Sequence, residues 1–114
     1  MQKAERILSD TILLSEIEVV DIDVWRVPVS KEYPKGIRYS YNYRLYVDER
    51  WVDVVRWDNY HGARPHKDTR DPETGRKKRE PDRFRTPDEV MDVIYSMRDE
   101  IKAKWKVMKW KKKS

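Results

Sequence analysis

The chain has 114 residues, enough for one domain with a modest hydrophobic core but not for a second domain of substance. Charged residues make up 41% of it, yet five tryptophans and seven tyrosines supply large apolar area, so we expect a folded protein with a very charged surface. The absence of cysteine excludes disulfides, zinc–thiolate sites and thiol catalysis, and no apolar run resembles a signal peptide or membrane span, which favours a soluble cytoplasmic protein.

The N-terminal part predicts a short helix and a strand. Residues 1–10, MQKAERILSD, fit a short N-terminal helix, which would have to dock on the rest of the protein because a helix of that length does not hold by itself. From Glu16 to Pro28 polar and apolar residues alternate. This is the period of a half-buried strand, with Val20, Ile22 and Val24 on its buried face.

The clearest strand is IRYSYNYRLYV at 37–47. Its alternation places Tyr39, Tyr41 and Tyr43 on one face and Arg38 and Arg44 on the other. Tyrosines and arginines on a sheet also fit a stacking platform for RNA bases, but no RNP motif accompanies them. Core packing is therefore the expected role of the tyrosines.

A short turn at 48–50, DER, leads into a second strand, WVDVVRWD at 51–58. This segment is apolar on both faces, with Val52 and Val54 on one and Trp51, Val55 and Trp57 on the other. We therefore expect an antiparallel hairpin whose second strand lies inside the sheet.

Residues 71–75, DPETG, are typical of a turn, with proline early and glycine late. The turn separates two highly charged segments, ARPHKDTR and RKKREPDRF. They fit a second hairpin at the edge of the sheet, where basic residues oppose pairing with other chains.

The strongest local signal is TPDE at 86–89. Thr86 fits an N-cap, Pro87 the first helical position and Glu89 the third, which predicts a helix that begins with a capping box. An apolar stripe with spacings of three and four follows and predicts packing across one face of the sheet. The stripe consists of Val90, Val93, Ile94, Met97, Ile101, Trp105 and Met108.

Together these segments predict an α+β fold, an antiparallel sheet of four to five strands with one long C-terminal helix packed on it. We expect residues 1–114 to form a single domain, with a compact core over 17–101 and a lysine-rich helix end or tail over 102–114. The sequence does not determine the oligomeric state.

Both histidines lie in the stretch RWDNYHGARPHKD at 56–68. His61, His66 and Asp68 offer two imidazoles and a carboxylate, which are ligands of zinc and non-haem iron. The loop between the histidines contains glycine and proline and fixes no ligand geometry. A metal site is therefore the weaker alternative, and no cofactor is expected.

The same stretch fits acid–base chemistry on RNA. Metal-free cleavage needs a base for the 2′-hydroxyl proton, an acid for the leaving oxygen and a cation for the phosphorane charge. His61, His66 and Arg56 supply these groups, and Asp58 lies two residues from Arg56 on the same side of a strand. The alternative is a structural loop, in which Arg56 and Asp58 form a surface ion pair.

The net charge of +5 is concentrated at the C-terminal end, where residues 102–114 hold seven lysines and no acid. Three roles are open: contact with nucleic acid, a solvated helix end, or an amphipathic face on an anionic membrane. Trp105 continues the core stripe and is expected to pack. The candidate nucleic-acid contacts are Lys104, Lys106, Lys109, Trp110, Lys111, Lys112 and Lys113.

The order of motifs resembles a known family. The motifs are VWRVP at 24–28, YPKGIRYSYNY at 33–43, VVRWDNYHG at 54–62, PHKD at 65–68, DPETG at 71–75 and TPDE at 86–89. They look like a family of small, largely archaeal proteins of unknown function, which is similar in turn to the TumE-type toxins of toxin–antitoxin pairs. The resemblance covers about residues 17–105, and its most specific part is the R-aromatic-D-N-x-H-G segment followed by P-H-K.

The resemblance implies a compact α+β protein partnered by a helix-turn-helix antitoxin, with Arg56, Asp58, His61 and His66 as its site. In TumE-like sequences the loop tends to end in His-x-His. Here it ends in His66-Lys67-Asp68, so that Asp68 takes the place of the second histidine. The leading hypothesis is a toxin or stand-alone relative that acts on RNA. The alternative is a non-enzymatic module that binds nucleic acid or protein, without a membrane contact.

Overall fold

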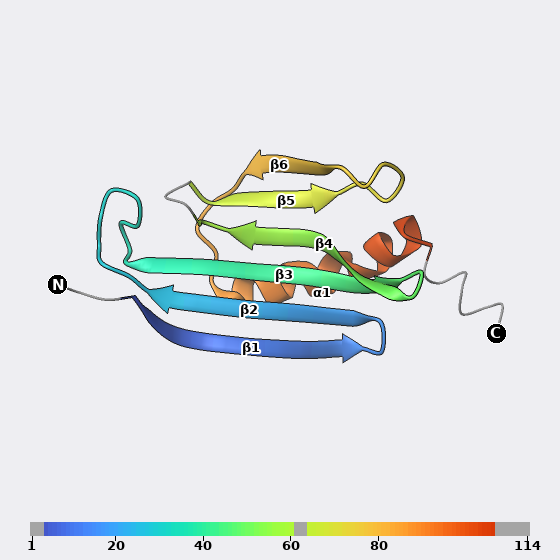
Figure 1. Cartoon of the computed structure of the whole chain (residues 1–114), viewed down its shortest axis with the longest axis horizontal. Coiled ribbons are helices and arrows are strands. Elements are labelled where there is room, and N and C mark those ends of the chain that lie inside the picture. Colours follow the sequence, from blue (N-terminus) through green and yellow to red (C-terminus); the bar gives the residue numbers. More distant parts are fainter. Residues whose placement is uncertain (1–3, 61–63, 107–114) are drawn as a thin grey trace.

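The computed structural model describes residues 4–60 and 64–106, which form six strands and one helix (Figure 1). The elements are β1 (Glu5–Ser15), β2 (Glu18–Arg26), β3 (Ile37–Val47), β4 (Arg50–Asp58), β5 (His66–Arg70), β6 (Lys77–Pro81) and α1 (Pro87–Lys104). The strands form one antiparallel sheet in the order β1-β2-β3-β4-β5-β6. The α+β class and the C-terminal helix are confirmed, but the prediction of four to five strands is wrong because the sheet has six.

The additional strand is β1, in the segment for which the sequence suggests a short helix. That prediction is wrong: Glu5–Ser15 pairs with β2 along its whole length. Ser9, Asp10 and Thr11 are poor helix formers, and a helix this short must meet its nucleation cost alone. An edge strand instead gains its hydrogen bonds from a neighbour that is already in place.

The tyrosine face of β3 belongs to the core, as predicted. Tyr39, Tyr41 and Tyr43 have no more than 1% of their surface exposed and pack in the same cluster as Ile94 of α1. Tyr39 and Tyr41 stack with their ring centroids 4.7 Å apart. The Tyr41 hydroxyl donates to the backbone carbonyl of Arg85, 2.9 Å away. These rings are therefore enclosed by the fold and do not form a stacking platform.

β4 lies inside the sheet, as predicted, but its two faces divide differently from the prediction. A bulge at Val54 shifts the pairing with β3 by one residue. A bulge adds one residue to one strand, so side chains beyond it change face. Val52 therefore shares the helix-covered face with Trp57, while Trp51 lies 40% exposed on the opposite face.

The second hairpin is confirmed as β5 and β6, with β6 at the edge of the sheet. Its turn begins at Asp71, whose carboxylate accepts hydrogen bonds from the backbone of Glu73 and Thr74 at 2.7 and 3.2 Å. Gly75 closes the turn with a φ of 73°, a conformation that glycine adopts without strain. The turn thereby places β6, a strongly basic strand, antiparallel to β5.

The helix begins as predicted. Thr86 is the N-cap, and its side chain and that of Glu89 complete a capping box. Val90, Ile94 and Ile101 of the predicted stripe are buried against the sheet, and Trp105 packs beside them, whereas Met108 lies outside the described residues. In the described part of the chain no helix is both long and apolar enough to cross a membrane.

A buried carboxylate joins the helix to the sheet. Glu18 at the start of β2 has no exposed surface, and Arg98 of α1 donates to both of its oxygens. Tyr43 and Ser15 each donate a hydroxyl to it at 2.7 Å, and Lys102 lies 3.5 Å away. Burial alone raises the pKa of Glu18, but the hydrogen bonds from Arg98, Ser15 and Tyr43 outweigh it and lower the pKa to about 2. Glu18 therefore stays ionised in the native protein.

The helix covers one face of the sheet (Figure 1). The opposite face, here called the open face, carries polar side chains from β2 to β6. Residues paired across antiparallel strands point to the same face, so the pairing defines rows across it. One row holds Asp23, Ser40, Asp58 and His66, and the next holds Asp21, Asn42, Arg56, Asp68 and Arg79. Three predicted site residues thus share the open face.

Candidate functional site

Asp58 and His66 form a buried pair where β4 ends and β5 begins. Each is 5% exposed, and His66 Nε2 lies 2.9 Å from Asp58 Oδ1. On the other side of the ring, Nδ1 lies 3.1 Å from the backbone carbonyl oxygen of Arg64. Because a carbonyl oxygen only accepts, this contact assigns the proton of the neutral ring to Nδ1. The lone pair of Nε2 is then directed to the side of Asp58.

Nε2 makes no aligned hydrogen bond to Asp58 despite the short distance. A lone pair beside a carboxylate is electrostatically unfavourable until a proton or another cation lies near both. The pair therefore combines an imidazole and a carboxylate, the two groups most often used in acid–base catalysis.

Asp68 is held by Arg79 from β6. Arg79 Nε and Nη2 donate to the two carboxylate oxygens at 2.9 and 3.1 Å, a bidentate arrangement. The hydrogen bonds from Arg79 lower the pKa of Asp68 against the opposing effect of burial. Asp68 is therefore an ionised carboxylate that is already neutralised by its own partner.

Three buried residues also offer ligands for a metal ion. Asp58, His66 and Asp68 place one ligand atom each within 4.8 Å of one another. A histidine whose Nδ1–H is held by a backbone carbonyl has the usual tautomer of a metal ligand. This set contains Asp58 where the sequence suggested His61, which lies outside the described residues. A cation here would compete with Arg79 for Asp68, so an acid–base role needs less rearrangement.

Arg56 contributes a positive charge beside this pair. It lies between Asn42 and Asp68 on the neighbouring strands, but within residues 4–60 and 64–106 it has no ion pair with a carboxylate, Asp58 included. Its Nε is buried and makes no hydrogen bond. A guanidinium without a counter-ion is suited to hold an anionic group such as phosphate.

The residue after Asp58 explains part of the local motif. Asn59 is buried, and its side chain accepts from the Tyr39 backbone N–H at 2.8 Å and donates to the Ile37 carbonyl at 2.9 Å. The amide thus continues the pairing between β3 and β4 beyond the last strand residue. Asn59 has a structural role: it fixes the exit of the chain from the sheet just after Asp58.

The open face also collects the unsatisfied polar atoms of the described residues. Five buried side-chain atoms lack a hydrogen-bond partner there: Asp23 Oδ1, Arg38 Nε, Asn42 Oδ1, Arg56 Nε and His66 Nε2. All five belong to residues that the strand pairing places on the open face. Buried polar groups are nearly always paired, and exceptions gather where a ligand or water completes them. The open face is therefore the binding face we favour.

The site contains residues that the sequence did not single out. Arg79 lies opposite Asp68 in a segment for which the sequence predicts only a charged edge strand, and for Arg38 it predicts only a place on the strand that carries the tyrosines. Arg38 was detectable, because its alternation in β3 puts it on the face away from Tyr39. The partnership of Arg79 with Asp68 depends on the register of β6, which the sequence does not specify.

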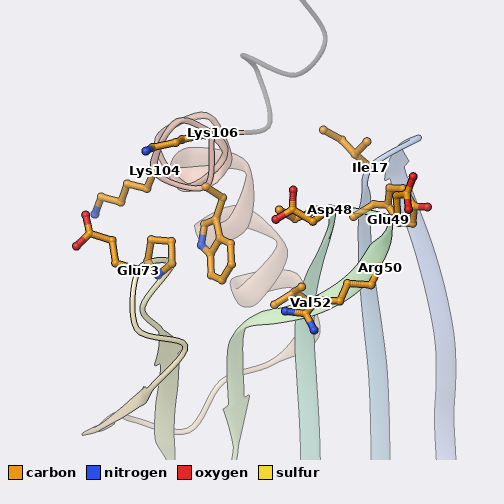
Figure 2. Close-up of a pocket in the computed structure, with 12 residues that line it drawn as sticks. Ile17, Asp48, Glu49, Arg50, Val52, Glu73, Lys104 and Lys106 are labelled. Atoms are coloured by element: carbon orange, nitrogen blue, oxygen red, sulfur yellow. The ribbon is translucent and has the colours of Figure 1, made fainter. Parts of the chain in front are cut away.

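The predicted tail contacts lie away from this site. Lys104 and Lys106 line an open hollow of about 990 Å³ between the end of α1 and the turn after β3, beside Asp48, Glu49 and Glu73 (Figure 2). Lys104 is also 3.5 Å from Glu100 on its own helix. The hollow and Asp58 lie at opposite ends of β4, about 25 Å apart along the strand. The other predicted contacts, Lys109, Trp110, Lys111, Lys112 and Lys113, lie outside the described residues.

Comparison with known proteins gives one match. The family described as toxin TumE matches residues 2–104, which is most of the chain. No curated protein and no solved structure matches the chain. The matched range contains Arg56, Asp58, His61 and His66 together with all six strands.

Proposed function

This chain belongs to the TumE family of toxins from toxin–antitoxin pairs, and on this premise we propose that it acts by cleaving RNA. The observation that carries the proposal is the Asp58–His66 pair with the uncompensated guanidinium of Arg56 on the same face. Membership of the family implies an antitoxin partner. We further propose that this antitoxin is a helix-turn-helix protein, which a small gene of that type beside this one would support.

In the proposed reaction His66 removes the proton of a ribose 2′-hydroxyl, for which Nε2 turns from its buried position beside Asp58 to the substrate. The 2′-oxygen attacks the adjacent phosphorus while the bond from phosphorus to the 5′-oxygen of the next nucleotide breaks. His61 supplies the proton that this leaving oxygen needs, and Arg56 stabilises the charge of the phosphorane. Asp58 orients His66 and stabilises its protonated form. The products are a 2′,3′-cyclic phosphate and a 5′-hydroxyl end.

The test uses the purified chain with an end-labelled single-stranded RNA in the presence of EDTA. We expect fragments that end in a 2′,3′-cyclic phosphate, and no cleavage of the all-deoxy strand of the same sequence, because DNA lacks the attacking hydroxyl. Cleavage of both strands at equal rates would show that the 2′-hydroxyl is not the nucleophile. Loss of activity in EDTA, with recovery on adding a divalent metal, would favour the metal alternative at Asp58, His66 and Asp68.

A second function, a non-enzymatic binding module, is favoured by one observation. Asp58 and His66 are each 5% exposed, which suits a pair that stabilises the end of the sheet. In that case the toxin would act by occupying its target, and RNA would be bound without any products. The same cleavage experiment separates the two functions, because binding without fragments supports the module.

We propose that the lysine-rich end, residues 102–114, adds affinity for RNA without taking part in cleavage. A chain that ends at Lys106 should bind RNA more weakly, and the slope of log affinity against log salt should fall by about 0.7 for each lysine that contacts a phosphate. Its cleavage rate on saturating short RNA should stay unchanged. Filter binding at several salt concentrations measures the slope. An unchanged slope would show that the tail does not contact the RNA.

A further inference from the structure

Four side chains form a ladder of alternating cations and rings across one end of the open face. Arg6 lies 4.8 Å from the Trp25 ring, Arg38 lies 5.3 Å from the same ring, and Arg38 also lies 4.8 Å from the Tyr60 ring. The residues come from β1, β2, β3 and the chain just after β4. Arg38 is thus held between two aromatic rings, which are half-buried.

Asp23 anchors the rings of the ladder. Its Oδ2 accepts from the Trp25 indole N–H and from the Tyr60 hydroxyl, both at 3.0 Å. Its Oδ1 lies 3.1 Å from Arg6, so the charge of Asp23 is matched by that residue. The geometry of the ladder is therefore fixed before any ligand arrives, which reduces the entropy lost on binding.

Arg38 differs from Arg44 and Arg79, two other arginines of the open face, in having no acidic partner. Arg44 is paired with Asp21, and Arg79 with Asp68. Among the described residues, no carboxylate forms an ion pair with Arg38, and its Nε is buried without a hydrogen bond. Arg38 and Arg56 are thus two guanidinium groups of the open face that form no ion pair with a carboxylate of the described residues.

These two arginines lie on either side of the Asp58–His66 pair. Along β3, Ser40 lies between Arg38 and Asn42. Ser40 belongs to the row of Asp58 and His66, and Asn42 to the row of Arg56. Arg38 and the residue opposite Arg56 are four positions apart on β3, about 13 Å along the strand. A single phosphate group does not cover such a span, whereas consecutive nucleotides do.

We propose that Trp25, Arg38 and Tyr60 form a subsite for the nucleotide next to the cleaved phosphodiester, and that the substrate is therefore single-stranded RNA. Arg38 takes the neighbouring phosphate, and the base packs its face against the exposed edges of the Trp25 and Tyr60 rings. Only unpaired bases offer their faces to aromatic rings in this way. The inference rests on the proposed function for the position of the cleaved bond.

The test measures binding without cleavage. A fluorescein-labelled RNA with 2′-O-methyl groups is titrated with the protein, and its anisotropy is followed at fixed salt. Trp25→Leu and Arg38→Gln should each weaken binding by about tenfold or more, while Trp25→Phe should retain most of the affinity because it keeps a ring. The same strand in a duplex should bind less tightly than the single strand.

Trp51→Leu is the matched control. Trp51 lies on the same open face, and Arg44 lies 5.8 Å from its ring, but it is at the other end of β4. The Trp51→Leu variant should bind the oligonucleotide as tightly as the unchanged chain. Equal losses in Trp51→Leu and Trp25→Leu, or equal losses in Trp25→Phe and Trp25→Leu with all variants folded by circular dichroism, would overturn the subsite.

The outcomes separate this inference from the proposed function. If Trp25→Leu and Arg38→Gln bind RNA normally but lose affinity for the antitoxin, the ladder is a protein interface and the subsite is wrong, while cleavage by His66 stands. If the ladder variants lose RNA binding but no RNA is ever cleaved by the unchanged chain, the subsite stands and the proposed reaction fails.

Discussion

Replacing Glu18 with alanine is expected to lower the free energy of unfolding by about 3–5 kcal/mol at pH 7. The change removes the carboxylate that accepts from Arg98, Tyr43 and Ser15 in an enclosed position. It leaves the Arg98 guanidinium, 23% exposed, without its partner at the contact between helix and sheet. Urea unfolding followed by tryptophan fluorescence gives the difference between the two proteins.

Glu5→Ala is the matched control for this prediction. Glu5 is also a strand glutamate near an arginine, but its side chain is 68% exposed and its nearest Arg26 nitrogen is 4.0 Å away. Exposed pairs at this distance contribute little to stability. We expect no measurable change in Glu5→Ala. A similar loss in both variants would show that the burial of Glu18 does not decide the effect.

The contribution of Glu18 should depend on pH in a defined direction. Its pKa is about 2 in the folded chain against an ordinary 4.5, so its stabilising effect is complete above pH 4.5 and is lost as the pH falls towards 2. The gap in stability between the unchanged chain and Glu18→Gln should therefore narrow over that range. Glu89 also has a pKa of about 2, lowered by the backbone of Thr86, but it is present in both proteins and cancels in the comparison.

The parts of the fold that follow from local rules could be predicted from the sequence. The alternation in β2 and β3 and the capping box at Thr86 are local patterns, and the strands and the helix start that they predict are those of the structure. The bulge at Val54 could not be predicted, because it depends on the pairing with β3. The short-range pattern at Trp51 therefore assigned that residue to the wrong face.

The candidate site was predictable in part of its composition but not in its arrangement. The sequence brought Arg56, Asp58 and His66 into one stretch, and the structure places them on one face. The pairing of His66 with Asp58 comes from the register of β4 and β5, which crosses a loop and leaves no periodic signal in the sequence. The commitment of Asp68 to Arg79 depends in the same way on a second hairpin.

The second large effect is expected at the Asp58–His66 pair. Under the proposed function, His66→Gln should reduce the rate of RNA cleavage by about 10²–10⁴-fold, the usual contribution of a general base. Glutamine keeps a polar side chain in the buried position but takes up no proton. Single-turnover cleavage of a short RNA at saturating protein measures the chemical step apart from binding.

Lys67→Gln is the control for His66→Gln. Lys67 is the next residue of β5, and its pairing with Trp57 places it on the other face of the sheet. The control should cleave at the normal rate and unfold at the normal urea concentration. If His66→Gln loses activity only in proportion to the folded protein that it loses, His66 is structural and the binding module is the better account.

Asp58→Asn tests whether the two residues act as one unit. Asparagine keeps the shape of the side chain but does not stabilise a protonated His66, so the rate should fall strongly in this variant too. Groups that act together are non-additive, so the double variant with His66→Gln should be about as slow as His66→Gln alone. If the two losses multiply instead, Asp58 acts on the substrate independently of His66. The short distance between Nε2 and Oδ1 would then be a consequence of packing in the sheet and not part of the mechanism.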